Sequence, residues 1–237
     1  MIAIIGRGNV ALHLYKALKG KTDVALVNPH TMEGFPENTD ITLISVSDNA
    51  IEEVSKKIPP SDAVIAHTAG SVPMEILSGQ NKDYGVFYPL QTFTKDVDLN
   101  YKEIPVFIEG SSTEVTEKLK KTASLFSEDV READSETRKK LHLASVFANN
   151  FTNALAGVSQ DILKDTDITF SALIPLMKQT VNKLGFLSPR EAQTGPAARG
   201  DSKVINSHLE MLRDKPELQE IYSKMSNLIS QKNEKRL

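Results

Sequence analysis

The residues best suited to binding a ligand form a glycine-rich loop near the amino end of the chain. The segment Gly6-Arg7-Gly8-Asn9-Val10-Ala11 follows an apolar run and opens a helical pattern. In such a loop Gly6 permits a tight turn, Gly8 lets the backbone approach a diphosphate, and Ala11 lets the helix pack close to the strand. The first amides of the helix and its dipole favour a negative group. The spacing therefore predicts a dinucleotide site. Its expected cofactor-binding residues are Gly6, Arg7, Gly8, Asn9 and Val10.

Residues at the ends of later strands extend this predicted site, because ligands of open α/β sheets bind outside the carboxyl ends of the strands. The second strand ends at Asn28, where NAD-selective domains usually carry an acidic residue that binds the ribose hydroxyls. Because Asn28 cannot repel a 2′-phosphate, NADP is the favoured cofactor, and NAD stays possible. The further cofactor-binding residues expected at this edge are Asn28, Val46, Ser47, His67 and Thr68.

Polar residues that could act on a substrate lie in an apolar helix predicted over residues 136–164. His142 can serve there as general acid or base, while an asparagine orients a carbonyl or imine group. At ~100° per residue, His142, Asn149 and Asn153 share one direction, whereas Asn150 points about a quarter turn away. The alternative is a polar network between helices, since buried amide and imidazole groups need hydrogen-bond partners. Helical geometry alone favours Asn149 over Asn150.

Arg199 is the candidate anion-binding residue of the second half. It follows Gly195-Pro196, and a guanidinium can bind a carboxylate in bidentate fashion. The alternative is that Arg199 pairs with Asp201 or binds helix carbonyls. No metal site is expected, because the five histidines show no ligand spacing and the chain has no cysteine.

Two regions of the chain, with different sequence patterns, position these residues. Over residues 1–133, short apolar runs alternate with helical segments, which is typical of a mostly parallel Rossmann-type α/β sheet with helices on both faces. Over residues 134–237 only helices are predicted, which indicates an all-α C-terminal domain for substrate binding and dimerisation. The expected strands are 2–5, 24–27, 41–46, 63–66, 85–88 and 105–108. The expected helices are 9–19, 49–57, 113–126, 136–164, 168–184, 202–213 and 216–234.

The composition is that of an ordinary globular protein: of 237 residues, 40% are hydrophobic and 25% charged, and the net charge is -3. Such a charge gives no field for nucleic acid, and no apolar run approaches the ~20 residues that cross a bilayer. No signal-peptide features are visible, so a cytoplasmic protein is expected. The helix over 136–164 is apolar on two sides, which predicts a homodimer formed by the helical domain.

Several segments together resemble a family of Rossmann-like NADP-binding proteins with a helical C-terminal domain of unknown function. The resemblance covers nearly the whole chain. Ala69 stands where the family often has serine, and Tyr88 replaces the usual histidine. The matching segments are residues 6–11, 46–51, 67–71, 88–93, 142–150 and 194–201, followed by His208.

The resemblance implies an NADP-dependent oxidoreductase related to pyrroline-carboxylate reductases, β-hydroxyacid dehydrogenases and deazaflavin-dependent NADP reductases. Such an enzyme transfers a hydride between NADP(H) and a small carbonyl or imine metabolite at the cleft between its domains. The implied catalytic residues are His142, Asn150, which the family pattern prefers over Asn149, and Arg199. The alternative is an NADP(H)-binding sensor or scaffold protein without turnover.

Overall fold

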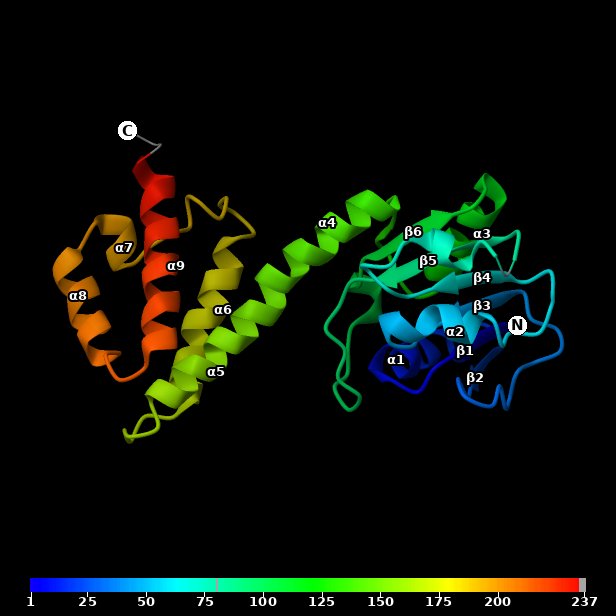
Figure 1. Cartoon of the computed structure of the whole chain (residues 1–237), viewed down its shortest axis with the longest axis horizontal. Coiled ribbons are helices and arrows are strands. Elements are labelled where there is room, and N and C mark those ends of the chain that lie inside the picture. Colours follow the sequence, from blue (N-terminus) through cyan, green and yellow to red (C-terminus); the bar gives the residue numbers. More distant parts are fainter. Residues whose placement is uncertain (80, 235–237) are drawn as a thin grey trace. The chain divides into compact units, whose positions relative to one another are not determined.

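A seven-stranded sheet forms the centre of the first of two units, Met1–Leu155 and Ala156–Leu237, in the computed structural model (Figure 1). The structure describes residues 1–79 and 81–234. The strands lie in the order β2-β1-β3-β4-β5-β6-β7, and every neighbouring pair is parallel except β5 and β6. Their bounds are β1 (Ile2–Ile5), β2 (Val24–Val27), β3 (Ile41–Ile44), β4 (Val64–His67), β5 (Tyr84–Pro89), β6 (Val106–Gly110) and β7 (Val130–Glu132). The predicted Rossmann-type α/β fold is confirmed.

Helices cover both faces of this sheet, as the unbroken apolar strands predicted. Alternate side chains of β1 point to opposite faces: Ile2 and Ile4 join one core cluster, whereas Ala3 and Ile5 join the other. The first cluster packs against α1 (Asn9–Leu18) and α3 (Thr113–Ala123), and the second against α2 (Ile51–Ser55) with the short 3-10 segments η1 (Asp48–Ala50) and η2 (Met74–Leu77). Another such segment, η3 (Tyr101–Glu103), precedes β6.

The chain direction around β1 creates a place for a ligand. From β1 the chain passes to β2 on one side and then returns to β3 on the other. The loops that leave β1 and β3 therefore separate at the carboxyl edge of the sheet, which is where open α/β sheets bind their ligands. Because β4 and β5 are parallel to β3, their carboxyl ends reach the same edge.

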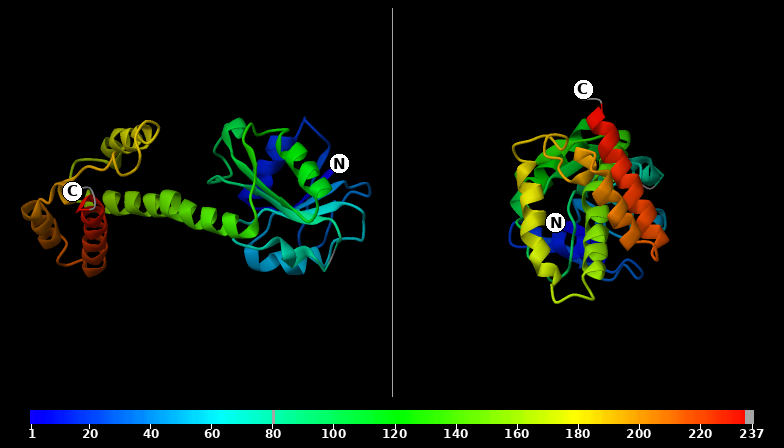
Figure 2. Two further views of the ribbon diagram at one scale, coloured as in Figure 1. Left: turned by 90° about the horizontal axis from the view of Figure 1, so that it is seen from above. Right: turned by 90° about the vertical axis from the view of Figure 1, so that its left-hand side faces the viewer.

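A long helix follows the sheet, and its middle differs from the prediction. The regular helix predicted over 136–164 is α4 (Ser135–Ser145), then a π-helical segment η4 (Val146–Phe151), then α5 (Thr152–Ile162) (Figure 2). The Asp134 side chain accepts a hydrogen bond from the Thr137 amide and so caps α4. The last strand ends at Glu132, close to the predicted domain boundary, whereas the first unit extends to Leu155.

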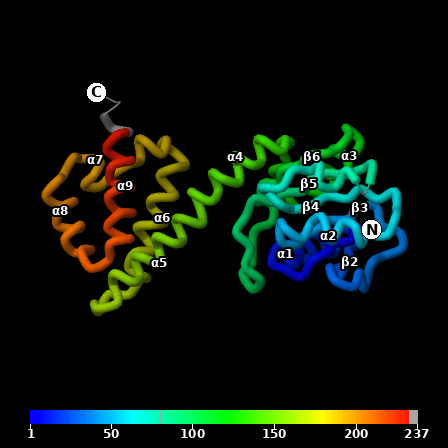
Figure 3. The backbone as a smooth tube through the Cα atoms, in the orientation of Figure 1, coloured from blue at the N-terminus to red at the C-terminus, as the bar shows by residue number. Residues whose placement is uncertain are grey.

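The second unit is helical in its described part (Figure 3). It contains η5 (Phe170–Leu173), α6 (Ile174–Lys183), α7 (Pro196–Arg199), α8 (Ser202–Met211) and α9 (Pro216–Glu234), and α7 packs against α8 and α9. The short helix α7 begins at a proline and is followed by Gly200 at φ 67°, and it was not among the helices predicted from the sequence. Strand β7 was also missed, because its three residues are partly or fully exposed and two are charged. Through residue 234, with Gln80 left aside, no helix is long and apolar enough to cross a membrane.

Candidate functional site

The first glycine of the loop after β1 is required by the backbone and by its neighbours. Gly6 has φ 153°, a conformation that side-chain-bearing residues rarely adopt. A Cβ atom at this position would lie 2.1 Å from the carbonyl oxygen of Ser45 and 3.1 Å from the Cβ of Ala11. Ala11 itself is fully buried. The two small residues therefore let β1, β3 and α1 approach one another, as the motif predicted.

The second glycine leaves space for a ligand. Gly8 has ordinary extended dihedral angles, and a Cβ built on it meets no atom within 4 Å. It is the N-cap of α1, yet no side chain caps this helix and its first turn contains no acidic residue. The first amides of the helix are thus available to an anion, and the approach to them is open. This arrangement fits the diphosphate of a dinucleotide.

A hollow of about 560 Å³ opens beside this loop at the carboxyl edge of the sheet, within the first unit. A second hollow of about 420 Å³ shares several of its walls and reaches the π-helical segment. The first is lined by Arg7, Gly8, Asn9, Val10, Ser45, Val46, Ser47, Asp48, Thr68, Ala69, Gly70, Tyr88, Gln91, Phe93 and His142. The second adds Pro89, Leu90, Thr92, Ser145, Ala148, Asn149 and Asn150.

These walls bring together most residues that the sequence predicted. The cofactor candidates on them are Arg7, Gly8, Asn9, Val10, Val46, Ser47 and Thr68. Of the catalytic candidates, His142 lines both hollows and Asn150 lines the second. Gly6 lies behind the loop, where it fixes the turn, and Arg199 ends α7 in the second unit. The proposed role of Arg199 stays a prediction.

The choice between Asn149 and Asn150 changes because of the π-helical segment. A rotation of ~100° per residue holds for an α-helix, whereas a π-helix bonds from i to i+5 and turns less per residue. Both asparagines lie within η4 and both line the second hollow. Both neighbouring residues therefore border the same space, which the sequence pattern did not indicate. Such segments occur frequently at functional sites.

His67 occupies a different place from the one predicted. Its side chain is fully buried, and it is absent from the walls of both hollows. The Ala69 amide donates to its Nδ1 at 3.2 Å, and its Nε2 lies 3.4 Å from the Pro73 carbonyl oxygen. Burial, together with the charge of Arg138, lowers the pKa of His67 to about 4. His67 thus stabilises the loop after β4 as a neutral ring, and the expected contact with a cofactor is not supported by its position.

This burial predicts a pH dependence of stability. Folded His67 stays neutral down to about pH 4, whereas an unfolded histidine gains a proton near pH 6.5. Its contribution to the free energy of unfolding is therefore present above pH 6.5 and lost as the pH falls towards 4, by roughly 3 kcal/mol. Urea unfolding across this range should show the loss, and the His67→Asn variant should show a smaller slope. Equal slopes for the two proteins would contradict the assignment.

Asn28 directly follows β2 but does not line either hollow. Its Oδ1 accepts a hydrogen bond from the His30 amide at 3.0 Å, and its carbonyl accepts one from the Met32 amide at 2.9 Å. Met32 has φ 56°, so the turn after β2 is tightly wound. No acidic residue occupies the position where NAD-selective domains carry one, and the preference for NADP stays a prediction.

Tyr88 lines both hollows, although no functional role was predicted for it from the sequence. Its hydroxyl lies 3.2 Å from Nδ1 of His142, and the side chain is 9% exposed. Gly70 makes this contact possible, since a Cβ there would lie 2.7 Å from both His142 Nδ1 and Tyr88 Cζ. The only sequence feature that could have drawn attention to Tyr88 is that it replaces the histidine usual in the family. The Asp48 carboxylate, on the wall of the first hollow, accepts a hydrogen bond from the Ser71 hydroxyl.

Helix α1 holds the loop that follows β5 and supplies Gln91 and Phe93 to the hollows. The Asn9 side-chain amide donates to the Phe93 carbonyl at 2.9 Å, so Asn9 joins the two loops rather than pointing freely at a ligand. His13 is almost fully buried, and its ring nitrogens lie 2.9 Å from the Tyr101 hydroxyl and 2.8 Å from the Thr94 carbonyl oxygen. These contacts fix one wall of the site to the helix whose amino end forms another.

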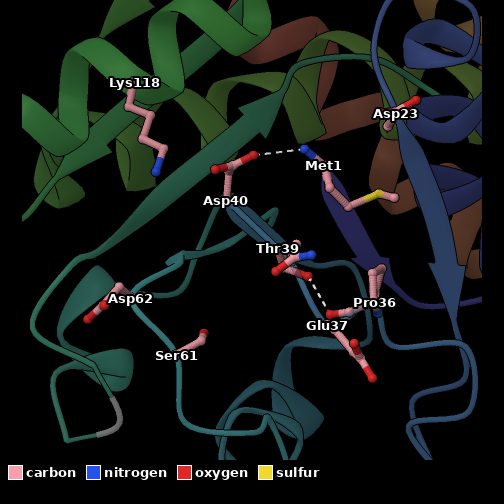
Figure 4. Close-up of a pocket in the computed structure, with 10 residues that line it drawn as sticks. Met1, Asp23, Pro36, Glu37, Thr39, Asp40, Ser61, Asp62 and Lys118 are labelled. Carbon is pink, nitrogen blue, oxygen red and sulfur yellow. Dashed lines mark hydrogen bonds and ion pairs between the residues drawn. The ribbon is translucent and has the colours of Figure 1, made fainter.

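A wider hollow of about 810 Å³ lies at the opposite edge, by the amino ends of the parallel strands (Figure 4). There the Met1 amino group pairs with the Asp40 carboxylate at 2.8 Å, and Lys118 is the one other basic residue on the wall. The remaining charged residues are acidic: Asp23, Glu37 and Asp62. Because open α/β sheets bind ligands at the other edge, the size of this hollow does not make it the better candidate.

Comparisons with known proteins agree with this fold. The model of a family described as "Domain of unknown function (DUF2520)" matches residues 104–229. A Bacteroides fragilis crystal structure described as that of a candidate NADP oxidoreductase is 38% identical, covers 97% of each chain and has a TM-score of 0.89. No curated protein matches the sequence.

More distant structures share the fold alone. A Thermotoga maritima protein is 22% identical, with 100% of this chain and 99% of that chain covered and a TM-score of 0.77. A reductive aminase from Aspergillus terreus, solved with NADPH and ethyl levulinate, is 14% identical, with 97% and 92% covered and a TM-score of 0.72. As the sequence resemblance predicted, the chain belongs to the DUF2520 family, whose structural relatives are Rossmann-type NADP oxidoreductases.

Proposed function

We propose that this protein binds NADP(H) and transfers a hydride between it and a small carbonyl or imine metabolite. The observation that carries the proposal is the open backbone at Gly8, beside an uncapped helix amino end, in the same hollow as His142. A dinucleotide and a proton-transfer group can therefore occupy one space. Arg7 adds a positive charge on its wall, and Asn28 leaves a 2′-phosphate unopposed. NADP is hence the proposed cofactor, with NAD as a weaker ligand.

The residues around the hollows suit the reduction of a polar double bond. When bound, a reduced nicotinamide would supply the hydride. His142 would give a proton to the substrate oxygen or nitrogen, and the amides of Asn149 and Asn150 would hold the carbonyl or imine in place. The apolar side chains of Val10 and Phe93 would limit the access of water. Arg199 is the proposed partner for a substrate carboxylate.

Structural relatives support this choice of chemistry. The Bacteroides fragilis protein is described as an NADP oxidoreductase candidate, and the Aspergillus terreus enzyme is a reductive aminase solved with NADPH. A reductive aminase acts on carbonyl and imine groups, which is the substrate class that the present walls can hold. The second candidate function is an NADP(H)-binding sensor or scaffold, which the small number of acid–base residues in the hollows favours.

Calorimetric titration with NADPH, NADP⁺, NADH and NAD⁺ tests the binding step. We expect the phosphorylated pair to bind more tightly, and no heat with any of the four at ~1 mM would contradict the proposal. Turnover is tested by NADPH oxidation in the presence of a panel of ketones, aldehydes and cyclic imines. The sensor would be favoured if NADPH bound tightly but none of these compounds caused its oxidation, and if His142→Ala left NADPH binding unchanged.

We also propose that the helical unit forms a two-fold homodimer. Large apolar side chains are exposed on it, among them Leu176 and Val181 on α6 and Phe186 with 89% of its surface exposed. A second copy of the same surface would cover them symmetrically. Light scattering at low micromolar concentration should give about twice the chain mass of 26.1 kDa. The double variant Leu176→Glu/Val181→Glu should lower it towards one chain, whereas a wild-type value of one chain would contradict the dimer.

A further inference from the structure

The hydroxyl of Tyr88 and the ring of His142 form a pair that neither the family pattern nor the comparisons assign. We infer that Tyr88 is a positioning residue: its hydroxyl donates to Nδ1 of His142 and thereby holds the proton of the neutral imidazole on Nε2. Because His142 lines both hollows, this tautomer offers one N–H donor to a substrate. The inference rests on the proposed function, in which His142 passes a proton to the substrate.

Contacts on several sides hold Tyr88 and His142 in place. The phenol oxygen lies 3.2 Å from Nδ1, and the two rings meet edge-on, with centroids 6.2 Å apart and planes at 65°. The ring of Tyr88 also lies against Phe107 on the neighbouring strand β6, with centroids 6.5 Å apart. The backbone carbonyl of His142 accepts a hydrogen bond at 2.7 Å from the hydroxyl of Ser145, which lies one turn further along α4. Any side chain at Gly70 would strike both rings.

Proton counting allows the inferred direction of this hydrogen bond, from the Tyr88 hydroxyl to Nδ1 of His142. Burial raises the pKa of Tyr88, although the Ser145 hydroxyl and the charge of Arg138 act in the opposite sense, so the phenol keeps its proton near neutral pH. A neutral imidazole has one accepting and one donating nitrogen. When Nδ1 accepts from Tyr88, the donating nitrogen is Nε2. For this nitrogen the described residues offer no partner within hydrogen-bonding distance, which leaves it for a substrate.

The same pair can deliver a proton without forming an unstable imidazole anion. The Nε2–H bond would break as the substrate oxygen or nitrogen takes the proton, which it would bind with the electron pair released from its double bond. A bound reduced nicotinamide would supply the hydride to the substrate carbon. The Tyr88 O–H bond breaks in the same step, and its proton moves to Nδ1. Imidazole therefore stays neutral, and the phenolate regains a proton from water in the hollow. The positive charge of Arg138 favours the phenolate in the interval.

The tautomer of His142 can be measured in the cofactor-free protein by ¹⁵N NMR of the full chain. Signals of His142 are assigned by their loss in His142→Gln. We expect the wild type to carry its proton on Nε2 and Tyr88→Phe to show a mixture of both tautomers. Tyr84→Phe is the matched control, because Tyr84 lies on the same strand and packs against the second core cluster, away from His142. It should leave the spectrum unchanged.

A wild-type proton on Nδ1, or an unchanged tautomer in Tyr88→Phe, would overturn the inference whatever the activity. If the panel identifies a substrate, Tyr88→Phe should lower kcat on the order of 10²-fold and leave the Kd for NADPH unchanged. The two proposals fail separately. Absent NADPH binding with the expected tautomer rejects the function and leaves the hydrogen bond, whereas turnover with the wrong tautomer rejects the pair and leaves the function.

Discussion

Replacing Gly8 by aspartate is expected to weaken NADPH binding at least ~100-fold, or about 2.7 kcal/mol, while the chain stays folded. Gly8 has dihedral angles open to any residue, and a side chain there meets no protein atom within 4 Å. The new carboxylate would therefore cost the fold little. It would, however, lie at the uncapped amino end of α1, where the diphosphate is proposed to bind. The two negative charges would then repel each other.

Two further variants separate binding from folding in this experiment. Gly79→Asp introduces the same charge at another exposed glycine with open space around it, and it should leave both the NADPH affinity and the thermal midpoint unchanged. Gly6→Ala should instead lower the thermal midpoint, because its Cβ would enter the Ser45 carbonyl. If Gly8→Asp bound NADPH as tightly as the wild type, the diphosphate would not lie at this loop and the proposed function would fall.

The sheet and the phosphate loop could be predicted because short stretches of sequence specify them. Four apolar residues in a row at Ile2–Ile5 indicate a strand covered on both faces, and two glycines followed by an amphipathic helix indicate the turn and its opening. The parallel strands β1 to β5 follow from repeating this unit, whereas the antiparallel β6 and the polar β7 do not. The polar composition of β7 gives no apolar signal, and pairing with β6 alone defines it.

Parts of the site could not be predicted, because contacts distant in sequence decide them. His67 and Thr68 are neighbours at a strand end, yet one side chain is buried and the other reaches the hollow. The contact between Tyr88 and His142 joins residues 54 positions apart and depends on Gly70. Likewise, no local pattern shows that the helix through Asn149 becomes π-helical, and this segment contains both asparagines that line the second hollow.

Replacing Arg138 by methionine should lower the free energy of unfolding by about 3–5 kcal/mol, the cost of removing one member of a buried ion pair. Only 1% of the Arg138 side chain is exposed, and its Nη1 lies 2.7 Å from Oε2 of Glu109, which is itself 12% exposed. The guanidinium also donates to the carbonyls of Val72 at 2.5 Å and Ala69 at 3.4 Å. Methionine would leave the Glu109 carboxylate without its cation, with hydrogen bonds from Ser135 alone among the described residues, and the two carbonyls would lose the guanidinium donor.

Burial, rather than distance, sets this expectation, and Arg131 provides the comparison. Its guanidinium lies 2.6 and 2.7 Å from the two carboxylate oxygens of Asp129, as short as the Arg138 pair, but its side chain is 63% exposed. Exposed pairs contribute about 0–1 kcal/mol, so Arg131→Met should change the urea midpoint little. Equal losses from the two variants would show that Arg138 contributes no more than a surface charge.

A double variant tests whether the cost comes from the abandoned carboxylate. In Glu109→Gln/Arg138→Met the charge is removed, while the glutamine oxygen can still accept from the Ser135 amide, which now donates to Glu109 at 2.8 Å. We expect this variant to recover part of the stability lost in Arg138→Met, because burying an unpaired charge costs more than burying a neutral amide. The carbonyls of Ala69 and Val72 would still lack a donor, so recovery should be incomplete. Since Arg138 lies one turn before His142 on α4 and binds the loop that contains Gly70, the residual loss should appear in the His142 ¹⁵N signals as well as in the unfolding curve.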